Sequence, residues 1–279
     1  MQKISCTSAK RSSKLDALLS VCIIFAKDNE ITRYNKRIMK TQLDVHTHTV
    51  ASGHAYSSLQ EMAQAAADKG LKILGITEHG PGIPGTCDPI YFRNMHCVPR
   101  QLYGIRLMLG AELNILNTNG DICLDEEHWR MLDLRIAGIH SLCWEGGTME
   151  ENTEGVVKAM RNPFMQIISH PGDGTAELDF ERLMQVSKET HTLLEINNHS
   201  LAPIRHKEVA RPNNLTLLRL AKKYDTPIIL GSDAHFSTMI AQYDNVMPLL
   251  KEVDFPDELI INYDVERFLN YLKPTPKKA

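Results

Sequence analysis

The sequence lacks the long apolar run that a membrane-spanning helix needs. No stretch approaches the roughly 18 consecutive apolar residues of a transmembrane segment, although 43% of the 279 residues are hydrophobic and 23% are charged. Those fractions are typical of a soluble globular protein, and the length fits one large α/β domain or two small ones. We therefore do not expect an integral membrane protein or a membrane partner.

Positive charge is scarce outside the N-terminal segment. Residues 1–38 hold eight Lys or Arg against three Asp or Glu, whereas the remainder holds 23 against 31. Because nucleic-acid binding depends on basic patches that neutralise phosphates, this acidic body argues against a nucleic-acid partner. Residues 1–38 imitate a signal peptide, but no A-x-A cleavage site follows their apolar stretch. We predict that they are an extension outside the fold and that residues 39–279 form a single functional domain, with Met39 as a plausible start.

Paired cysteines are also missing. Six cysteines are scattered along the chain with no CxxC pair, and a chain of this length does not need a disulfide framework. Cys87 and Cys97 lie in one His-containing loop, but without a paired signature free thiols are the favoured interpretation. Reduced thiols indicate the cytoplasm.

What the sequence does contain is a series of short apolar runs separated by helix-like stretches. The runs span residues 43–45, 72–77, 106–111, 133–139, 166–169, 192–196 and 227–232, and the predicted helices span residues 58–69, 149–160, 179–189, 214–224 and 265–272. Strands that alternate with helices indicate a parallel sheet, since parallel neighbours need long crossover connections. We predict an α/β fold in which parallel strands form a barrel.

Six of the seven runs are followed by His, Asp or Glu, and the seventh by Asn197 and Asn198. In a parallel barrel the residues that follow every strand gather at one face. Imidazole and carboxylate groups together suit zinc, manganese or iron. Nine candidate ligands are too many for one tetrahedral ion, so two or three ions are expected. These candidates are His46, His48, His54, His79, Glu112, His140, His170, Asp233 and His235.

Five other histidines, residues 96, 128, 191, 199 and 206, do not follow this pattern. His191 precedes a predicted strand and is expected to be structural. His199 and His206 follow the sixth run, from where they could reach a substrate.

The motifs resemble those of the polymerase-and-histidinol-phosphatase (PHP) phosphoesterases, and in particular of their small stand-alone YcdX-like branch. The resemblance covers almost all of residues 42–245. Its motifs are His46-Thr-His48, Thr77-Glu-His79-Gly80, Gly110-Ala-Glu112, Gly138-Ile-His140, Ser169-His170-Pro171-Gly172 and Gly231-Ser-Asp233-Ala-His235, with Val50 to Tyr56 and Glu195-Ile-Asn-Asn198 pointing to that branch. The family often has Asp where this chain has Glu78.

The resemblance implies a distorted seven-stranded, TIM-like (β/α) barrel with three divalent ions, zinc being favoured and Mn²⁺ or Fe²⁺ the alternatives. His46, His48 and Asp233 would hold the first ion, and Glu112 would bridge it to the second. His140 and His170 would complete the second ion's ligands, and the third would lie among His54, His79 and His235.

The implied reaction is hydrolysis of a small phosphate monoester by a metal-bound hydroxide, with Glu112, Asp233 and His140 as catalytic residues. A basic group should hold the phosphate, and Arg205, Lys207 and Arg211 follow the sixth run. Within the family, a histidinol-phosphate phosphatase and a 3′–5′ exonuclease are alternatives. A non-catalytic barrel would have lost ligands, and an amidohydrolase would usually show a carboxylated lysine. The physiological substrate is left open, as is a homo-oligomer.

Overall fold

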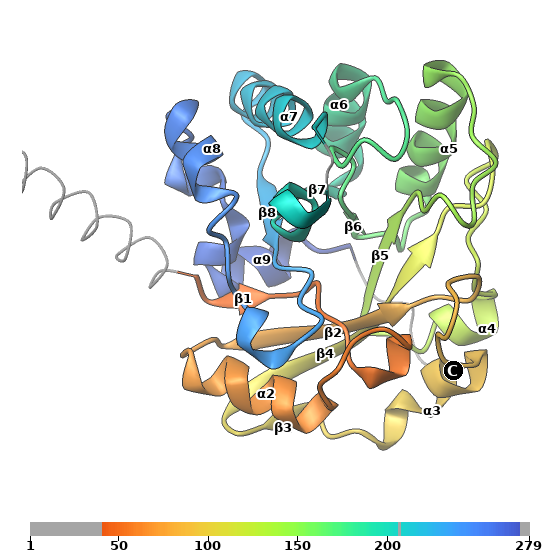
Figure 1. The fold of residues 1–279 in the computed structure, drawn as a ribbon, viewed down its shortest axis with the longest axis vertical. Helices are drawn as coiled ribbons and strands as arrows, with labels where there is room; N and C mark the ends of the chain where they lie inside the picture. The colour runs from red at the N-terminus through yellow and green to blue at the C-terminus, as the bar shows by residue number, and fades with distance from the viewer. Residues whose placement is uncertain (1–40, 206–207, 274–279) are drawn as a thin grey trace, which may run out of the picture. The chain divides into compact units, whose positions relative to one another are not determined.

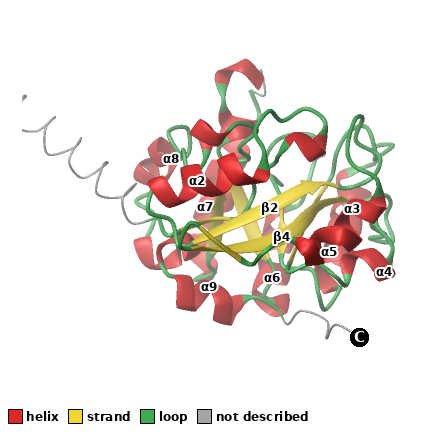
Figure 2. Ribbon diagram, turned by 90° about the horizontal axis from the view of Figure 1, so that it is seen from below, coloured by secondary structure: helices red, strands yellow, loops and turns green. Residues whose placement is uncertain are grey.

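Seven parallel strands neighbour one another in the order in which they occur along the chain. The computed structural model describes residues 41–205 and 208–273, so the predicted extension over residues 1–38 lies outside the described residues. The parallel strands are β1 (Leu43–Asp44), β2 (Ile73–His79), β4 (Ile105–Asn114), β5 (Leu134–Gly138), β6 (Ile167–Ile168), β7 (Leu193–Asn197) and β8 (Ile228–Gly231). They confirm the predicted seven-stranded α/β barrel (Figures 1 and 2). A short strand that was not predicted, β3 (Gln101–Leu102), pairs antiparallel with β4.

The barrel is nearly closed, because its first and last strands meet through single contacts rather than through a ladder. At the carboxyl ends, Thr47 forms a parallel bridge with Ala234. Further down, Asn262 fills the gap between the strands. Its side chain accepts from the Leu230 N–H (2.8 Å) and donates to the carbonyls of Leu230 (2.8 Å) and Leu43 (3.2 Å). One buried amide thus takes the place of a missing strand pairing.

The helices begin where their sequences supply a cap. The five predicted helices correspond to α2 (Leu59–Asp68), α5 (Met149–Arg161), α6 (Phe180–Thr190), α7 (Ala210–Tyr224) and α9 (Val265–Tyr271). Ser58 with Glu61, and Thr148 with Glu151, form capping boxes in which each side chain satisfies a free backbone N–H. α7 begins four residues before its predicted start, since Pro212 lies in the first turn, where its missing N–H costs nothing. Three short helices were not predicted: α3 (Pro89–Asn94), α4 (Glu126–Trp129) and α8 (Met247–Glu252).

An apolar cluster fills the barrel toward the amino ends of the strands. It combines Leu43, Ile73, Leu134, Ile167 and Leu193 with other strand residues and with Ile261 and Phe268 from the C-terminal part of the chain. All of these side chains are buried, so this end of the barrel has no room for a ligand. The predicted ligands lie at the opposite end, at or after the carboxyl ends of the strands. Among the described residues, no helix is long and apolar enough to cross a bilayer.

Candidate metal centre

The nine predicted ligands come from six strands or the loops after them. His79 is the last residue of β2 and pairs in register with Glu112 of β4. The other predicted ligands follow the carboxyl ends of β1, β5, β6 and β8. Because all of these strands run in one direction, their ends lie at one face of the barrel. The loop after β8 is held by Asp44 of β1, whose carboxylate accepts from the N–H groups of Ser232 (3.3 Å) and Ala241 (2.8 Å).

Glu112 lies at the centre of this face. One carboxylate oxygen, Oε2, is 2.9 Å from His79 Nδ1, 3.3 Å from His46 Nε2 and 3.5 Å from His48 Nε2. The other, Oε1, is 2.8 Å from His170 Nε2 and 3.3 Å from His140 Nε2. Five imidazoles thus face one fully buried carboxylate. Neighbouring ligand atoms on a tetrahedral zinc ion, with bonds of about 2.0–2.1 Å, lie about 3.3 Å apart, which matches these separations.

Asp233 faces a second set of imidazoles. Its Oδ1 atom is 3.2 Å from His48 Nε2, 3.6 Å from His46 Nε2 and 3.5 Å from His235 Nδ1. The Asp233 backbone has a φ of +53°, and that of His170 has a φ of +33°. Non-glycine residues adopt such values rarely and at a cost, and strained residues tend to cluster at functional sites. Strain at two predicted ligands is therefore consistent with a functional site.

His54 extends the cluster toward solvent. Its ring centroid lies 4.9 Å from that of His79 and 4.9 Å from that of His235. The His48 ring is nearer to both, at 4.2 Å from His79 and 4.6 Å from His235. Groups whose ligand atoms all lie within 4.8 Å of one another are His48–His79–His235, His46–His48–Glu112 and His79–Glu112–His140. His79 therefore lies between the predicted second and third sets.

The facing atoms have no other partners. His46 Nε2, His48 Nε2, His79 Nδ1, His140 Nε2, Glu112 Oε2 and Asp233 Oδ1 are buried without a hydrogen bond. A buried polar atom without a partner costs free energy, so such atoms are rare unless they serve another purpose. Six of them directed at one another, all of ligand type, fit a set of divalent cations. Imidazole and carboxylate donors favour zinc, manganese or iron over calcium.

The pKa values of the two carboxyl groups in the cluster are strongly shifted. Burial opposes ionisation of Glu112, but His46, His140 and His79 outweigh it and hold the pKa of this carboxyl well below its usual value. The pKa of Asp233 is likewise well below its usual value, since His46 and His48 outweigh its burial. Both carboxylates are thus ionised at neutral pH and ready to bind a cation.

The imidazoles fall into two groups. Burial alone would lower the pKa of His46 and of His170, but nearby carboxylates outweigh it. The carboxylates of Glu195, Glu112 and Asp233 raise the pKa of His46 well above its usual value, and Glu112, with Asp173 and Glu195, raises that of His170 to about 9. Burial lowers the pKa of His48 and of His140. These two are neutral at pH 7 and can bind a metal without losing a proton.

No hydrogen bond or ion pair joins the predicted phosphate-binding residues that the structure describes to the predicted metal ligands. Arg205 is exposed, in the loop after β7, and close enough to affect the pKa of His199. Arg211, in the first turn of α7, forms an ion pair with Glu252 of α8. Lys207 lies outside the described residues, as does His206. Of the two basic residues that the structure describes, Arg205 is the one whose charge affects a histidine near the predicted ligands.

Among the other histidines, His199 joins the cluster. Its ring centroid is 5.4 Å from that of His235, and its Nδ1 atom is buried without a hydrogen bond. His191, by contrast, ends α6, and its ring contacts Tyr271. His191 thus lies before β7, where it was predicted to be structural.

Sequence reasoning assigned no role to two buried carboxylates behind the ligands. Glu195 of β7 accepts from His46 Nδ1 at 2.7 Å. Glu78 of β2 accepts from the Ser52 hydroxyl at 2.6 Å, and Ser52 in turn lies 3.1 Å from His48 Nδ1. The available signal was a glutamate inside an apolar strand, where a charge must have partners.

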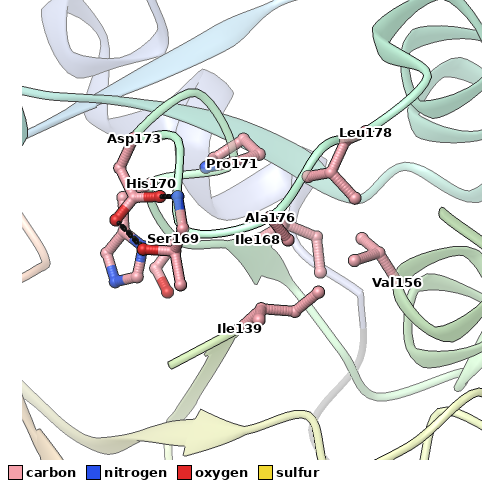
Figure 3. Close-up of a pocket in the computed structure, with 10 residues that line it drawn as sticks. Ile139, Val156, Ile168, Ser169, His170, Pro171, Asp173, Ala176 and Leu178 are labelled. Atoms are coloured by element: carbon pink, nitrogen blue, oxygen red, sulfur yellow. Dashed lines mark hydrogen bonds and ion pairs between the residues drawn. The ribbon is translucent and has the colours of Figure 1, made fainter. Parts of the chain in front are cut away.

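A small pocket lies behind His170 (Figure 3). It is lined by residues of the β6–α6 loop together with Ile139, Val156 and Ile168. Asp173 lies on its polar side, with Oδ2 at 3.7 Å from His170 Nδ1. Of the nine predicted ligands, the pocket is lined by His170 alone, so it borders the candidate centre without forming it.

Comparison with known proteins agrees with this geometry. The PHP domain family matches residues 44–253. A protein of Clostridium novyi named "Probable phosphatase" is 43% identical over 239 residues, which cover 86% of this chain and 97% of that protein. A second "Probable phosphatase", from Acetivibrio thermocellus, is 41% identical over 84% of this chain and 96% of its own length. The fold is similar to that of the histidinol phosphate phosphatase of Lactococcus lactis subsp. lactis, solved with zinc, L-histidinol and phosphate. The TM-score is 0.51 at 17% identity, covering 77% of this chain and 95% of that one.

Proposed function

Because the chain belongs to the PHP domain family, we propose that the buried cluster is the catalytic centre of a phosphatase that hydrolyses small phosphate monoesters with three divalent ions. That the chain is a phosphatase follows from its family and from its similarity, over most of its length, to proteins named as phosphatases. The observation that supports the metal centre is the set of six buried ligand-type atoms without partners.

Three ligand sets account for the nine residues. His46, His48 and Asp233 hold the first ion, and Glu112 bridges it to a second ion held by His140 and His170. The separation of the two Glu112 oxygens supports the bridge, since each oxygen faces a different group of imidazoles. His54, His79 and His235 hold the third ion at the solvent side. Zinc suits these donors best, with manganese or iron as alternatives.

The residues of the chain prepare the site for an anion. When bound, the ions supply a water of lowered pKa and positive charge that offsets the phosphoryl oxygens. Glu112 and Asp233 keep the ions together, while the buried walls around them exclude bulk water and strengthen the electrostatic interactions. The ring of His199 lies 5.4 Å from that of His235, and burial, together with the charge of Arg205 in the same β7–α7 loop, lowers the pKa of His199. We assign to His199 and Arg205 contacts with the substrate, Arg205 to its phosphate, because Arg pairs well with phosphate oxygens. For Arg211 the ion pair with Glu252 weakens the same assignment.

A substrate panel with metal analysis tests this proposal. The purified chain should contain zinc, manganese or iron and release phosphate from monoesters. A chelator should abolish the release, and added zinc or manganese should restore it. The panel should include L-histidinol phosphate, because the Lactococcus enzyme was solved with L-histidinol and phosphate, and single-stranded DNA, because the family resemblance leaves an exonuclease open. Monoester hydrolysis that persists without metal would refute the proposal, and activity on DNA alone would replace it.

A further inference from the structure

We propose that Glu195 is a positioning residue of the metal centre: it fixes the His46 ring and the His170 backbone so that both present Nε2 to the ions. The proposal rests on the metal centre inferred above. Glu195 is not itself among the ligands, and it is 1% exposed. Buried ionised groups are costly unless they are fully paired, so its position needs a reason.

Both carboxylate oxygens of Glu195 contact predicted metal ligands. Oε1 is 2.7 Å from His46 Nδ1. Oε2 accepts from the backbone N–H of His170 at 2.8 Å and from the Asn197 amide at 3.1 Å. One carboxylate thus contacts a ligand of the first ion and the strained backbone of a ligand of the second. It sets how far apart the two ligands lie.

The contact with His46 also determines which nitrogen faces the metal. A carboxylate is an acceptor only, so Nδ1 must carry the hydrogen. In the neutral ring that binds a metal, Nε2 then carries no hydrogen, and it is the atom that lies 3.3 Å from Glu112 and 3.6 Å from Asp233. Carboxylates that orient metal-binding imidazoles in this way typically contribute 10–100-fold to metal affinity. Glu195 has the geometry of such a partner.

The neighbouring strand is built to leave room for this side chain. A Cβ atom on Gly231 of β8 would lie 1.6 Å from Glu195 Oε1. Any other residue at position 231 would therefore push the carboxylate off His46. Glu78 provides an independent parallel, since it reaches His48 Nδ1 through the Ser52 hydroxyl. A buried carboxylate thus positions the Nδ1 side of each histidine of the first set, directly for His46 and through the Ser52 hydroxyl for His48.

The test is zinc affinity, measured on the full chain by competition with a chromophoric chelator. In Glu195→Gln the amide can accept at one atom but must donate at the other, so one of the two contacts is lost in either orientation. We expect zinc to bind 10–100-fold more weakly, with the melting temperature of the metal-free protein close to that of the parent. The visible spectrum of the cobalt-substituted protein should change as well, because the first coordination sphere is distorted.

Gly231→Ala is the second variant, because it keeps the Glu195 carboxylate but displaces it. It should reproduce the loss of affinity and the spectral change. Glu151→Gln is the matched control, because this exposed glutamate caps α5 through Thr148, and it should leave both unchanged. If Glu195→Gln does not fold, the zinc affinities of Gly231→Ala and Glu195→Asp test the positioning role instead.

The outcomes separate this role from the proposed function. If the parent chain binds zinc and hydrolyses monoesters while Glu195→Gln and Gly231→Ala bind zinc within twofold of it, the positioning role is wrong and the phosphatase stands. If the parent chain itself neither binds zinc nor is activated by another divalent ion, the proposed metal centre fails first.

Discussion

Glu112 contacts more of the cluster than any other residue described at the site. It faces imidazoles from four other strands or the loops that follow them, with oxygens that point to different groups. Its side chain is fully buried but contributes polar rather than apolar contacts, so its role lies in the site and not in the core.

We expect Glu112→Ala to lower phosphate release by at least about 100-fold, since even the partners behind metal ligands are worth 10–100-fold. The fold should persist, because the Glu112 carboxylate contacts other predicted metal ligands and not the apolar core. Its removal therefore opens no large apolar cavity. Circular dichroism, metal content and turnover check this together. Near-parental turnover with full metal content would show that the carboxylate is not needed.

The two groups of imidazoles predict how metal binding depends on pH. His46 and His170 have raised pKa values and carry protons at pH 7 in the metal-free protein, whereas those of His48 and His140 are lowered. A metal must displace the protons of the first pair. Affinity should therefore rise from pH 6 toward about 9, the pKa of His170, and activity should be low in mild acid.

Calorimetry in buffers of different ionisation enthalpy measures the protons released when zinc binds. His170→Asn should release about one proton fewer than the parent chain at pH 7, because the lost imidazole is one that carries a proton there. Equal release from both proteins, or an activity optimum near pH 5, would contradict the assignment.

At the scale of elements, the contact between β1 and β8 is the least regular part of the barrel. Asn262 makes three buried hydrogen bonds across it. Asn262→Ala leaves backbone groups of Leu230 and Leu43 unpaired, and each such group costs about 1–3 kcal/mol. We expect the free energy of unfolding of the metal-free protein to fall by at least about 2 kcal/mol in urea titrations. The exposed Asn119→Ala, in the turn after β4, is a matched control that should change it little. A loss no larger than in the control would mean that the gap closes without the amide.

The elements themselves were largely predictable from local sequence. Apolar runs gave all seven parallel strands, and capping boxes marked the starts of α2 and α5. The short helices α3, α4 and α8 were not predicted, because four to six residues are too few to show a helical periodicity. The role of Asn262 depends on contacts with Leu43, 219 positions away, and with Leu230, 32 positions away, and no local pattern reports that.

The site was predictable for the same reason as the strands, but only in part. Ligands at strand ends share one face by topology, so their convergence follows from counting strands. Glu195 acts through His46, which lies 149 residues away, and Arg211 turned toward Glu252 of α8. The partners of such side chains depend on packing between elements that are neighbours in the fold but distant in the sequence.

At the scale of the whole molecule, the proposed ions should stabilise the barrel. The predicted ligands come from six strands, or from the loops after them, so ions bound by them would favour the folded over the unfolded chain by mass action. At free zinc 100–1,000 times the dissociation constant the gain is about 2.7–4.1 kcal/mol, which corresponds to roughly 5–15 °C in melting temperature for a domain of this size. Calorimetric scans with and without chelator test this. An unchanged melting temperature would mean that the ions bind the unfolded chain equally well.

The domain boundary gives a second prediction at this scale. A chain that starts at Met39 should fold and release phosphate at the parental rate, because the described fold begins at Thr41 and the family match begins at residue 44. Turnover per mole of folded protein is the measurement, with the full chain as the reference. A truncated chain that folds but loses activity would place residues 1–38 in the function.

The bridge between Thr47 and Ala234 joins the start of the barrel to its end, and the ligand sets straddle it. His46 and His48 are synthesised early, but Asp233 and His235 leave the ribosome only after more than four fifths of the chain has been made. A chain that stops before Asp233 therefore lacks one ligand of the first predicted set and one of the third, although the second set is already present. The first and third predicted ion sites can be completed only when both ends of the barrel have been made and brought together.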